Sequence, residues 1–193
     1  MKMRLGYTSR ESSVVSRRIC KITGGQWSHV FAIFYGAGEP LYFESSWKRD
    51  KHTQKTGVRG PIPLSNVEDW QAESPDDHLF VTQPVAGFLP LSSGEVEGSF
   101  EIMDEAVHRV HYAKLQLAQN WISRRLGIFL HLGRGSVIEW TCSEAILRAC
   151  IPPRLWVYFD LLNFGADDYA PSGTNGPSIF DATQSMIDGE DQP

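Results

Sequence analysis

Residues 137–150 place a cysteine at the start of a predicted helix, and this stretch constrains the rest of the fold most strongly. An apolar run leads to Thr141, a good N-cap residue, and Glu144 follows at the third helical position, as a Thr-x-x-Glu capping box requires. The small and branched apolar residues after Glu144 supply a face that must be buried against another layer. We therefore predict a helix that begins at Cys142 and packs into the core.

The position of Cys142 favours a reactive thiol. Unpaired backbone N–H groups and the positive end of the helix dipole stabilise a thiolate at this point, so the pKa of the thiol should fall. The alternative is a buried structural cysteine, because free cysteine is among the most buried residue types. The stretch alone does not decide between the two, and a partner for Cys142 must come from elsewhere in the chain.

A hairpin pattern near the N-terminus offers such a partner. Residues 27–35 and 41–45 are rich in aromatic and branched side chains, and the glycines and proline between them are confined to residues 36–40. His29 lies at the entrance of the first strand, and Glu44 lies near the exit of the second. The predicted hairpin thus carries an imidazole and a carboxylate on neighbouring strands.

The register of this hairpin decides whether the two groups meet. Side chains alternate between the faces of a strand, and those on one face of an antiparallel pair lie opposite or diagonal to one another. If the turn centres on Ala37 and Gly38, Glu44 lies opposite Phe31, and His29 is the next residue along on the same face. A slip of one residue would separate them. The alternative for His29 is a partly buried strand histidine whose polar tip is satisfied locally.

Two further helical patterns occur in the chain. Residues 12–22 have a helix-compatible spacing that stops at a Gly-Gly pair, and residues 101–126 form the longest apolar helical face. His108 and His111 lie three apart on this second helix. Without a carboxylate or cysteine partner, such a pair is far more often a surface or packing feature than a metal site.

The connecting segments are less regular. We predict a loop over the polar and basic residues 47–60, irregular chain over 61–64 and 68–77, a strand over 78–82 and a connection over 84–98. Residues 154–163 are apolar enough for the core. Residues 1–170 are predicted as a single domain, and residues 171–193, which are rich in Gly, Pro, Ser and acidic side chains, as a partly mobile tail.

Composition excludes several classes of protein. A net charge of -5 argues against nucleic-acid binding led by phosphate contacts. Three cysteines without a Cys-x-x-Cys pair fit neither a disulfide scaffold nor a zinc cluster. The sequence also has no Gly-rich phosphate-binding loop of the kind that would indicate a nucleotide cofactor. No signal peptide or membrane-spanning run is recognisable, so we expect a cytoplasmic protein, although phage-encoded or specially exported enzymes also lack such signals.

The order of these parts resembles that of a known family. The matching pieces are Leu-Gly-Tyr at 5–7, Thr-Gly-Gly-Gln-Trp-Ser-His-Val at 23–30, Phe-Glu-Ser at 43–45, Thr-Cys-Ser-Glu-Ala at 141–145 and Pro-Ser-Ile-Phe-Asp at 177–181. A histidine hairpin that precedes a cysteine helix is similar to the circularly permuted papain-like cysteine hydrolases of the NlpC-like superfamily, in particular the YiiX/YebB-like branch. The pieces cover about a third of the chain, and the middle region, residues 47–135, matches no family pattern.

The resemblance implies an α+β, permuted papain-like fold in which a small antiparallel sheet packs against the cysteine-bearing helix. It further implies that Cys142 is the nucleophile, His29 the base and Glu44 the residue that orients the imidazole. The expected reaction is cleavage of an amide, either peptide or isopeptide, through a thioester acyl-enzyme, with no cofactor and no metal.

Two other functions remain open at this point. The lecithin:retinol acyltransferase-like branch shares the permuted order and acts on lipid acyl groups, but its cysteine motif is of the Asn-Cys-Glu-His type, whereas this chain has Thr-Cys-Ser-Glu at 141–144. A non-catalytic binding or structural module, such as a phage accessory protein, would keep the fold without turnover. The non-catalytic module is favoured if His29 and Cys142 lie too far apart for proton transfer, and the departure of the cysteine motif argues against acyl transfer to lipid.

Overall fold

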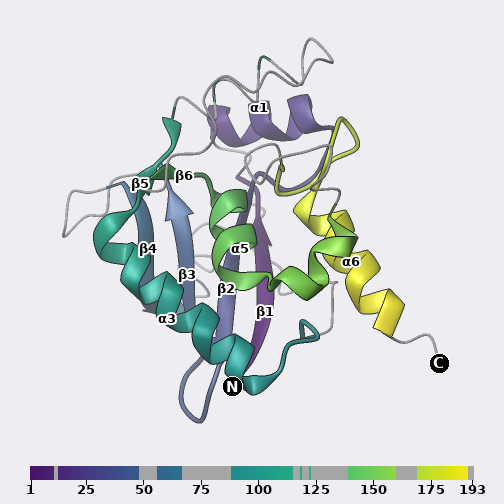
Figure 1. The fold of residues 1–193 in the computed structure, drawn as a ribbon. Coiled ribbons are helices and arrows are strands. Elements are labelled where there is room, and N and C mark those ends of the chain that lie inside the picture. The colour runs from purple at the N-terminus through teal and green to yellow at the C-terminus, as the bar shows by residue number, and fades with distance from the viewer. Residues whose placement is uncertain are drawn as a thin grey trace.

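The computed structural model describes residues 1–10, 13–47, 56–66, 88–114, 118, 122, 139–159 and 169–190. The predicted strand at 78–82 and the predicted irregular segment at 68–77 lie outside these ranges. Within them the protein is a mixed α+β structure with one small antiparallel sheet and several helices (Figure 1). The general α+β class predicted from the sequence is therefore confirmed.

The main sheet is an antiparallel meander of four strands in chain order. Its members are β1 (Lys2–Thr8), β2 (His29–Tyr35), β3 (Leu41–Ser46) and β4 (Gly57–Pro63). A second, two-stranded parallel sheet pairs β5 (His111–Tyr112) with β6 (Glu139–Trp140). The first hairpin predicted from the sequence is thus the centre of the main sheet, with β1 and β4 added on either side.

Within the described ranges the bounds of five helical segments are defined: α1 (Val14–Thr23), α3 (Ser93–Arg109), α5 (Cys142–Cys150), the 3-10 helix η1 (Pro153–Tyr158) and α6 (Ile179–Glu190). Figure 1 shows α3 and α5 across one face of the sheet, α1 over the end at which β1 ends and β2 begins, and α6 beside β1. The Tyr7 hydroxyl in β1 and the Thr183 hydroxyl in α6 share a hydrogen bond of 3.0 Å. The start of α5 and the start of β2 lie at the same end of the sheet.

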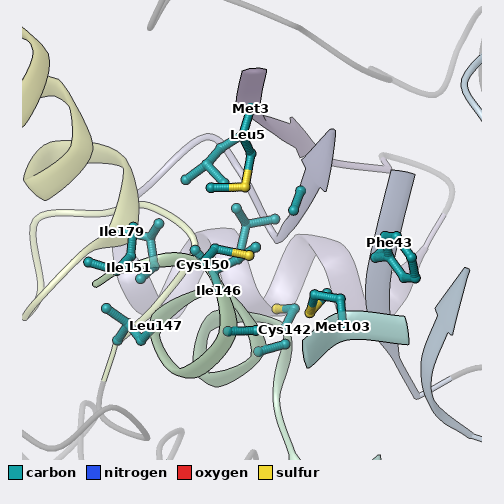
Figure 2. Packing of buried hydrophobic residues seen from close by; sticks show 14 of the residues in the cluster. Met3, Leu5, Phe43, Met103, Cys142, Ile146, Leu147, Cys150, Ile151 and Ile179 are labelled. Atoms are coloured by element: carbon teal, nitrogen blue, oxygen red, sulfur yellow. The ribbon is translucent and has the colours of Figure 1, made fainter. Parts of the chain in front are cut away.

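Helix α5 is the centre of the core. All of its residues are buried except Arg148, which explains why the helix needs a capped N-terminus rather than a solvated one. Ile146 and Cys150 belong to the same cluster as Met3 and Leu5 of β1 (Figure 2). The sheet therefore holds α5 firmly, and with it the residue at the first helical position.

The sequence prediction was wrong about residues 57–63, which form strand β4 rather than loop and irregular chain. Among the described strands, β4 is paired in the sheet with β3 and lies at its edge. Proline is tolerated at such an edge because its missing N–H faces no neighbour, so Pro61 and Pro63 do not prevent pairing. Pairing with β3 supplies the stabilisation that the local sequence lacks.

The predicted helix over residues 101–126 is confirmed over 101–109 and wrong over 110–113, while most of 115–126 lies outside the described ranges. Helix α3 begins earlier, at Ser93 within the predicted connection, because Ser92 and Glu95 form a capping box. It ends at Arg109, and the next residues pair with β6 instead of continuing the helix. The Val110 carbonyl accepts a hydrogen bond from the Val58 N–H at 3.3 Å, so tertiary pairing overrides helix propensity at this point.

Two segments near the C-terminus differ from expectation. In η1, Leu155 is buried, but Trp156 and Val157 are 44% and 82% exposed, so only part of the apolar run enters the core. The predicted tail contains α6, in which Ile179 and Met186 are fully buried. An apolar spacing within an otherwise acidic segment is sufficient for this packing.

None of the helices within the described ranges is long and apolar enough to cross a membrane.

Candidate active site

Cys142 occupies the first position of α5, as the capping box predicts. The Thr141 Oγ1 accepts a hydrogen bond from the Glu144 N–H at 3.2 Å, and the Glu144 Oε2 accepts one from the Thr141 N–H at 2.9 Å. The Ser45 hydroxyl of β3 donates to the Trp140 carbonyl at 2.9 Å, two residues before the cysteine. These contacts fix where α5 begins relative to the sheet.

His29 and Glu44 meet across the hairpin in the predicted register. Phe31 pairs with Glu44, and the His29 Nε2–H donates to the Glu44 Oε2 at 2.5 Å. The two side chains are 21% and 11% exposed, so solvent screens their interaction only weakly. The carboxylate therefore orients the ring.

Phe31 supports the His29 ring from beside it. The two rings are stacked, with centroids 6.3 Å apart. The phenyl ring lies directly over Gly6 of β1, where an added Cβ would come within 2.3 Å of a ring carbon. A glycine at this position thus gives Phe31 the space in which it lies against the imidazole.

Cys142 and His29 are hydrogen-bonding partners. Because the Nε2 of His29 is hydrogen-bonded to Glu44, the ring nitrogen left to form the hydrogen bond with the sulfur is Nδ1. The backbone N–H of Val30 and the hydroxyl of Ser143 also donate to the cysteine sulfur. The structure therefore brings together all three residues that the sequence selected: Cys142, His29 and Glu44.

The charges in this group favour a thiolate beside an imidazolium. Burial alone would raise the pKa of Cys142, but the hydrogen bond and charge of His29, with the donors of Val30 and Ser143, lower it below its usual 9.0. Burial would likewise lower the pKa of His29, yet hydrogen bonds with Cys142 and Glu44 raise it to about 10. Both shifts stabilise the ion pair relative to the neutral pair.

Glu44 completes the charge arrangement. Burial would raise the pKa of its carboxyl, but the hydrogen bond and charge of His29 and the charge of Arg59 lower it to about 2. The Arg59 Nε donates to the Glu44 Oε1 at 2.7 Å. Sequence reasoning missed Arg59 because residues 47–60 were predicted as a loop; a strand prediction for β4 would have placed it opposite Glu44.

Tyr112 is a second group near the site that the sequence did not reveal. Burial raises the pKa of its phenol well above the usual range, and the negative charges of Cys142, Glu144 and Glu44 add to the rise. Tyr112 was assigned to the predicted helix at 101–126 and was therefore not connected with the site. Its pairing opposite Trp140 in the parallel sheet is what brings it close to the start of α5.

The turn that leads into β2 is anchored by residues from the opposite end of the chain. The Ser172 hydroxyl accepts from the Trp27 N–H at 2.8 Å and donates to the Trp27 carbonyl at 3.2 Å. The Asn175 N–H donates to the Thr23 carbonyl at 2.9 Å. Gly173 has a φ of 138°, and a Cβ there would lie 2.1 Å from the same carbonyl. The C-terminal segment therefore fixes the approach of the chain to His29.

The other two cysteines lack this environment. Burial raises the pKa of Cys20, which is only partly covered, and also raises that of Cys150, which is completely buried. Among the described residues, no group of three or more His, Cys, Asp or Glu side chains is placed to hold a metal ion. His108 and His111 are exposed on α3 and β5, respectively.

No protein-family model matches the sequence, and a comparison with curated proteins finds no significant match.

Proposed function

We propose that this protein is a cysteine hydrolase of the permuted papain-like, NlpC-like type, with Cys142 as nucleophile, His29 as base and Glu44 as the residue that orients the base. One observation carries the proposal. The imidazole of His29 lies between the sulfur of Cys142 and the carboxylate of Glu44, at the N-terminus of a capped and buried helix. This is the nucleophile, base and orienter arrangement by which thiols are activated.

The first half of the reaction forms a thioester. The Cys142 proton resides on the Nδ1 of His29, and the thiolate attacks the carbonyl carbon of an amide. The tetrahedral intermediate collapses as its C–N bond breaks, and His29 gives its proton to the leaving amine. Glu44 stabilises the imidazolium throughout, because its carboxylate accepts the opposite N–H.

The second half regenerates the thiol. Water attacks the thioester while His29 accepts its proton, and the C–S bond then breaks to release a carboxylic acid. In both halves the oxyanion needs N–H donors near the sulfur. The N–H groups of Glu144 and Ala145 are bound by Thr141, so the earlier N–H groups of the first turn, on Cys142 and Ser143, are the ones placed to serve it.

An amide, either peptide or isopeptide and including cell-wall peptides, is the first substrate class. The Thr-Cys-Ser-Glu sequence at 141–144 differs from the Asn-Cys-Glu-His pattern associated with lipid acyl transfer, and this difference ranks fatty-acyl esters second. Both substrate classes form a thioester on Cys142, and they differ only in the acyl group that is transferred to the sulfur.

The test is a panel of aminocoumarin amides of short peptides, isopeptides and fatty acids, with each reaction also quenched for mass spectrometry of the intact protein. We expect turnover with at least one amide, an acyl adduct on Cys142, loss of turnover in Cys142→Ala and a smaller loss in Glu44→Gln. Turnover that survives Cys142→Ala, or an adduct on Cys20 alone, would refute the proposal.

A further inference from the structure

We propose that Arg59 is a positioning residue of this site, which holds the carboxylate of Glu44 ionised and correctly turned while the imidazole changes its charge. The inference rests on the proposed function, because it gives Arg59 a role in the same thiol chemistry. Arg59 reaches Glu44 from β4, where the two residues form a cross-strand pair.

The geometry divides the carboxylate between two partners. Glu44 Oε1 accepts a hydrogen bond from the Nε of Arg59 at 2.7 Å and forms an ion pair with the Nη2 of Arg59 at 2.5 Å. Glu44 Oε2 accepts a hydrogen bond from the Nε2 of His29 at 2.5 Å. Because each oxygen is bound on its own side, the carboxylate cannot rotate without breaking one of these contacts. Arg59 thereby fixes the direction from which Glu44 meets the ring.

The depth of the contact separates it from an ordinary surface ion pair. The side chain of Glu44 is 11% exposed and that of Arg59 is 29% exposed, so the pair is only weakly screened. By comparison, Arg109 and Glu105 form an ion pair in which the side chains are 72% and 59% exposed. The second pair provides a matched control for the first.

The two cationic partners of Glu44 differ in whether their charge changes during the proposed reaction. His29 of β2 faces it with a charge that appears and disappears during each catalytic cycle, while Arg59 of β4 is charged throughout. Burial, and then the charge of Glu44, raises the pKa of the phenols of Tyr42 in β3 and Tyr112 in β5, so both remain neutral; the charges of Arg59 and Arg10 lower the pKa of Tyr42. A buried carboxylate beside a neutral imidazole would tend to take up a proton. Arg59 is the constant cation that prevents this.

The test compares the rate at which iodoacetamide labels Cys142 between pH 4 and pH 9 in the wild type, Arg59→Gln, Arg59→Lys and Arg109→Gln. Loss of a facing positive charge raises a carboxyl pKa by about 1–3 units. A protonated Glu44 would no longer stabilise the imidazolium that keeps Cys142 as a thiolate, so we expect the labelling midpoint of Arg59→Gln to move up by about one pH unit. Arg59→Lys should recover only part of this shift, because it retains the charge but lacks the two nitrogens that together contact Glu44 Oε1. Arg109→Gln should match the wild type, and circular dichroism identifies any variant that fails to fold.

A double variant shows whether Arg59 acts through Glu44. If it does, Arg59→Gln should have no further effect once Glu44→Gln is present. Superimposable profiles of Arg59→Gln and wild type, or fully additive effects in the double variant, would overturn this inference while leaving the hydrolase proposal intact. A wild-type Cys142 that reacts no faster than Cys20 and Cys150 would overturn both.

Discussion

Thr141 and Glu144 exchange two hydrogen bonds at the start of α5, each side chain accepting from the backbone N–H of the other. The contact satisfies two N–H groups beside Cys142. We predict that Thr141→Ala lowers the free energy of unfolding by about 1 kcal/mol, the usual cost of a lost N-cap, as measured by urea denaturation. It should also slow iodoacetamide labelling of Cys142, because the first turn loosens.

Helix α3 provides the control for this variant. Ser92 and Glu95 form the same kind of capping box on a more exposed helix start. Ser92→Ala should cost a similar free energy of unfolding, about 1 kcal/mol, without changing the labelling rate of Cys142. Equal effects of Thr141→Ala and Ser92→Ala on labelling would show that the cap of α5 has no special influence on the thiol.

The three cysteines should differ in reactivity. We predict that iodoacetamide at neutral pH labels Cys142 faster than Cys20 or Cys150, because only Cys142 has a pKa below the usual value. His29→Ala should slow the labelling of Cys142 and leave Cys20 unchanged. Peptide mapping by mass spectrometry gives the three rates in one experiment, and similar rates for all three native thiols would contradict the activated state.

Stability should depend on pH through Glu44 and His29. The pKa of Glu44 falls from 4.5 to about 2 on folding, so its contribution is complete above pH 4.5 and is lost as the pH falls towards 2. The pKa of His29 rises from 6.5 to about 10, so its contribution is complete below pH 6.5 and is lost as the pH rises towards 10. Both contributions are therefore complete between pH 4.5 and 6.5.

Glu44→Gln should reveal this window. Breaking a buried ion pair costs about 3 kcal/mol, so we expect a difference of that order between wild type and variant at pH 6. Urea denaturation at pH 3, 6 and 9 should give the largest difference at pH 6. A difference that does not change with pH would mean that the Glu44 contact stabilises through packing rather than charge.

The C-terminal anchor can be tested at a single glycine. Gly173→Ala would place a Cβ 2.1 Å from the Thr23 carbonyl and force an unfavourable φ, so the turn before His29 must shift. We predict slower labelling of Cys142 and a lower melting temperature. Gly38→Ala is the matched control, since nothing lies within 4 Å of a Cβ at that hairpin position. Equal behaviour of the two variants would exclude an influence of the anchor on the site.

The two halves of the candidate site, the start of the cysteine helix and the register of the histidine hairpin, were predictable from local sequence signals, whereas the pairing of Cys142 with His29 was expected from the family resemblance alone. A capping box specifies where a helix begins from four adjacent residues, and a short hairpin turn sets the register of its strands. Thr141 with Glu144, and Phe31 opposite Glu44, are both found as predicted. The residues of the capping box are three positions apart, and the register of the hairpin is set by the short turn at residues 36–40, so both depend on near neighbours in the sequence.

The missed elements depend on contacts between distant segments. β4 contains two prolines and gains its order from β3, and β5 interrupts a helical pattern because it pairs with β6 about thirty residues later. Arg59 lies on β4 and Tyr112 on β5, so their places near the site could not be predicted from the local sequence. The Ser92 cap was different: its Ser-x-x-Glu signal was present in the sequence and was overlooked.

The bonds between Ser172 and Trp27 join residues 145 positions apart. Such a contact closes a very long loop, and topologies rich in distant contacts fold slowly. During synthesis, Cys142, His29 and Glu44 all leave the ribosome before Ser172 does. The nascent chain thus carries Cys142 for a time without the contacts that position His29, so, under the proposed function, we expect thiol activation to be among the last steps of maturation.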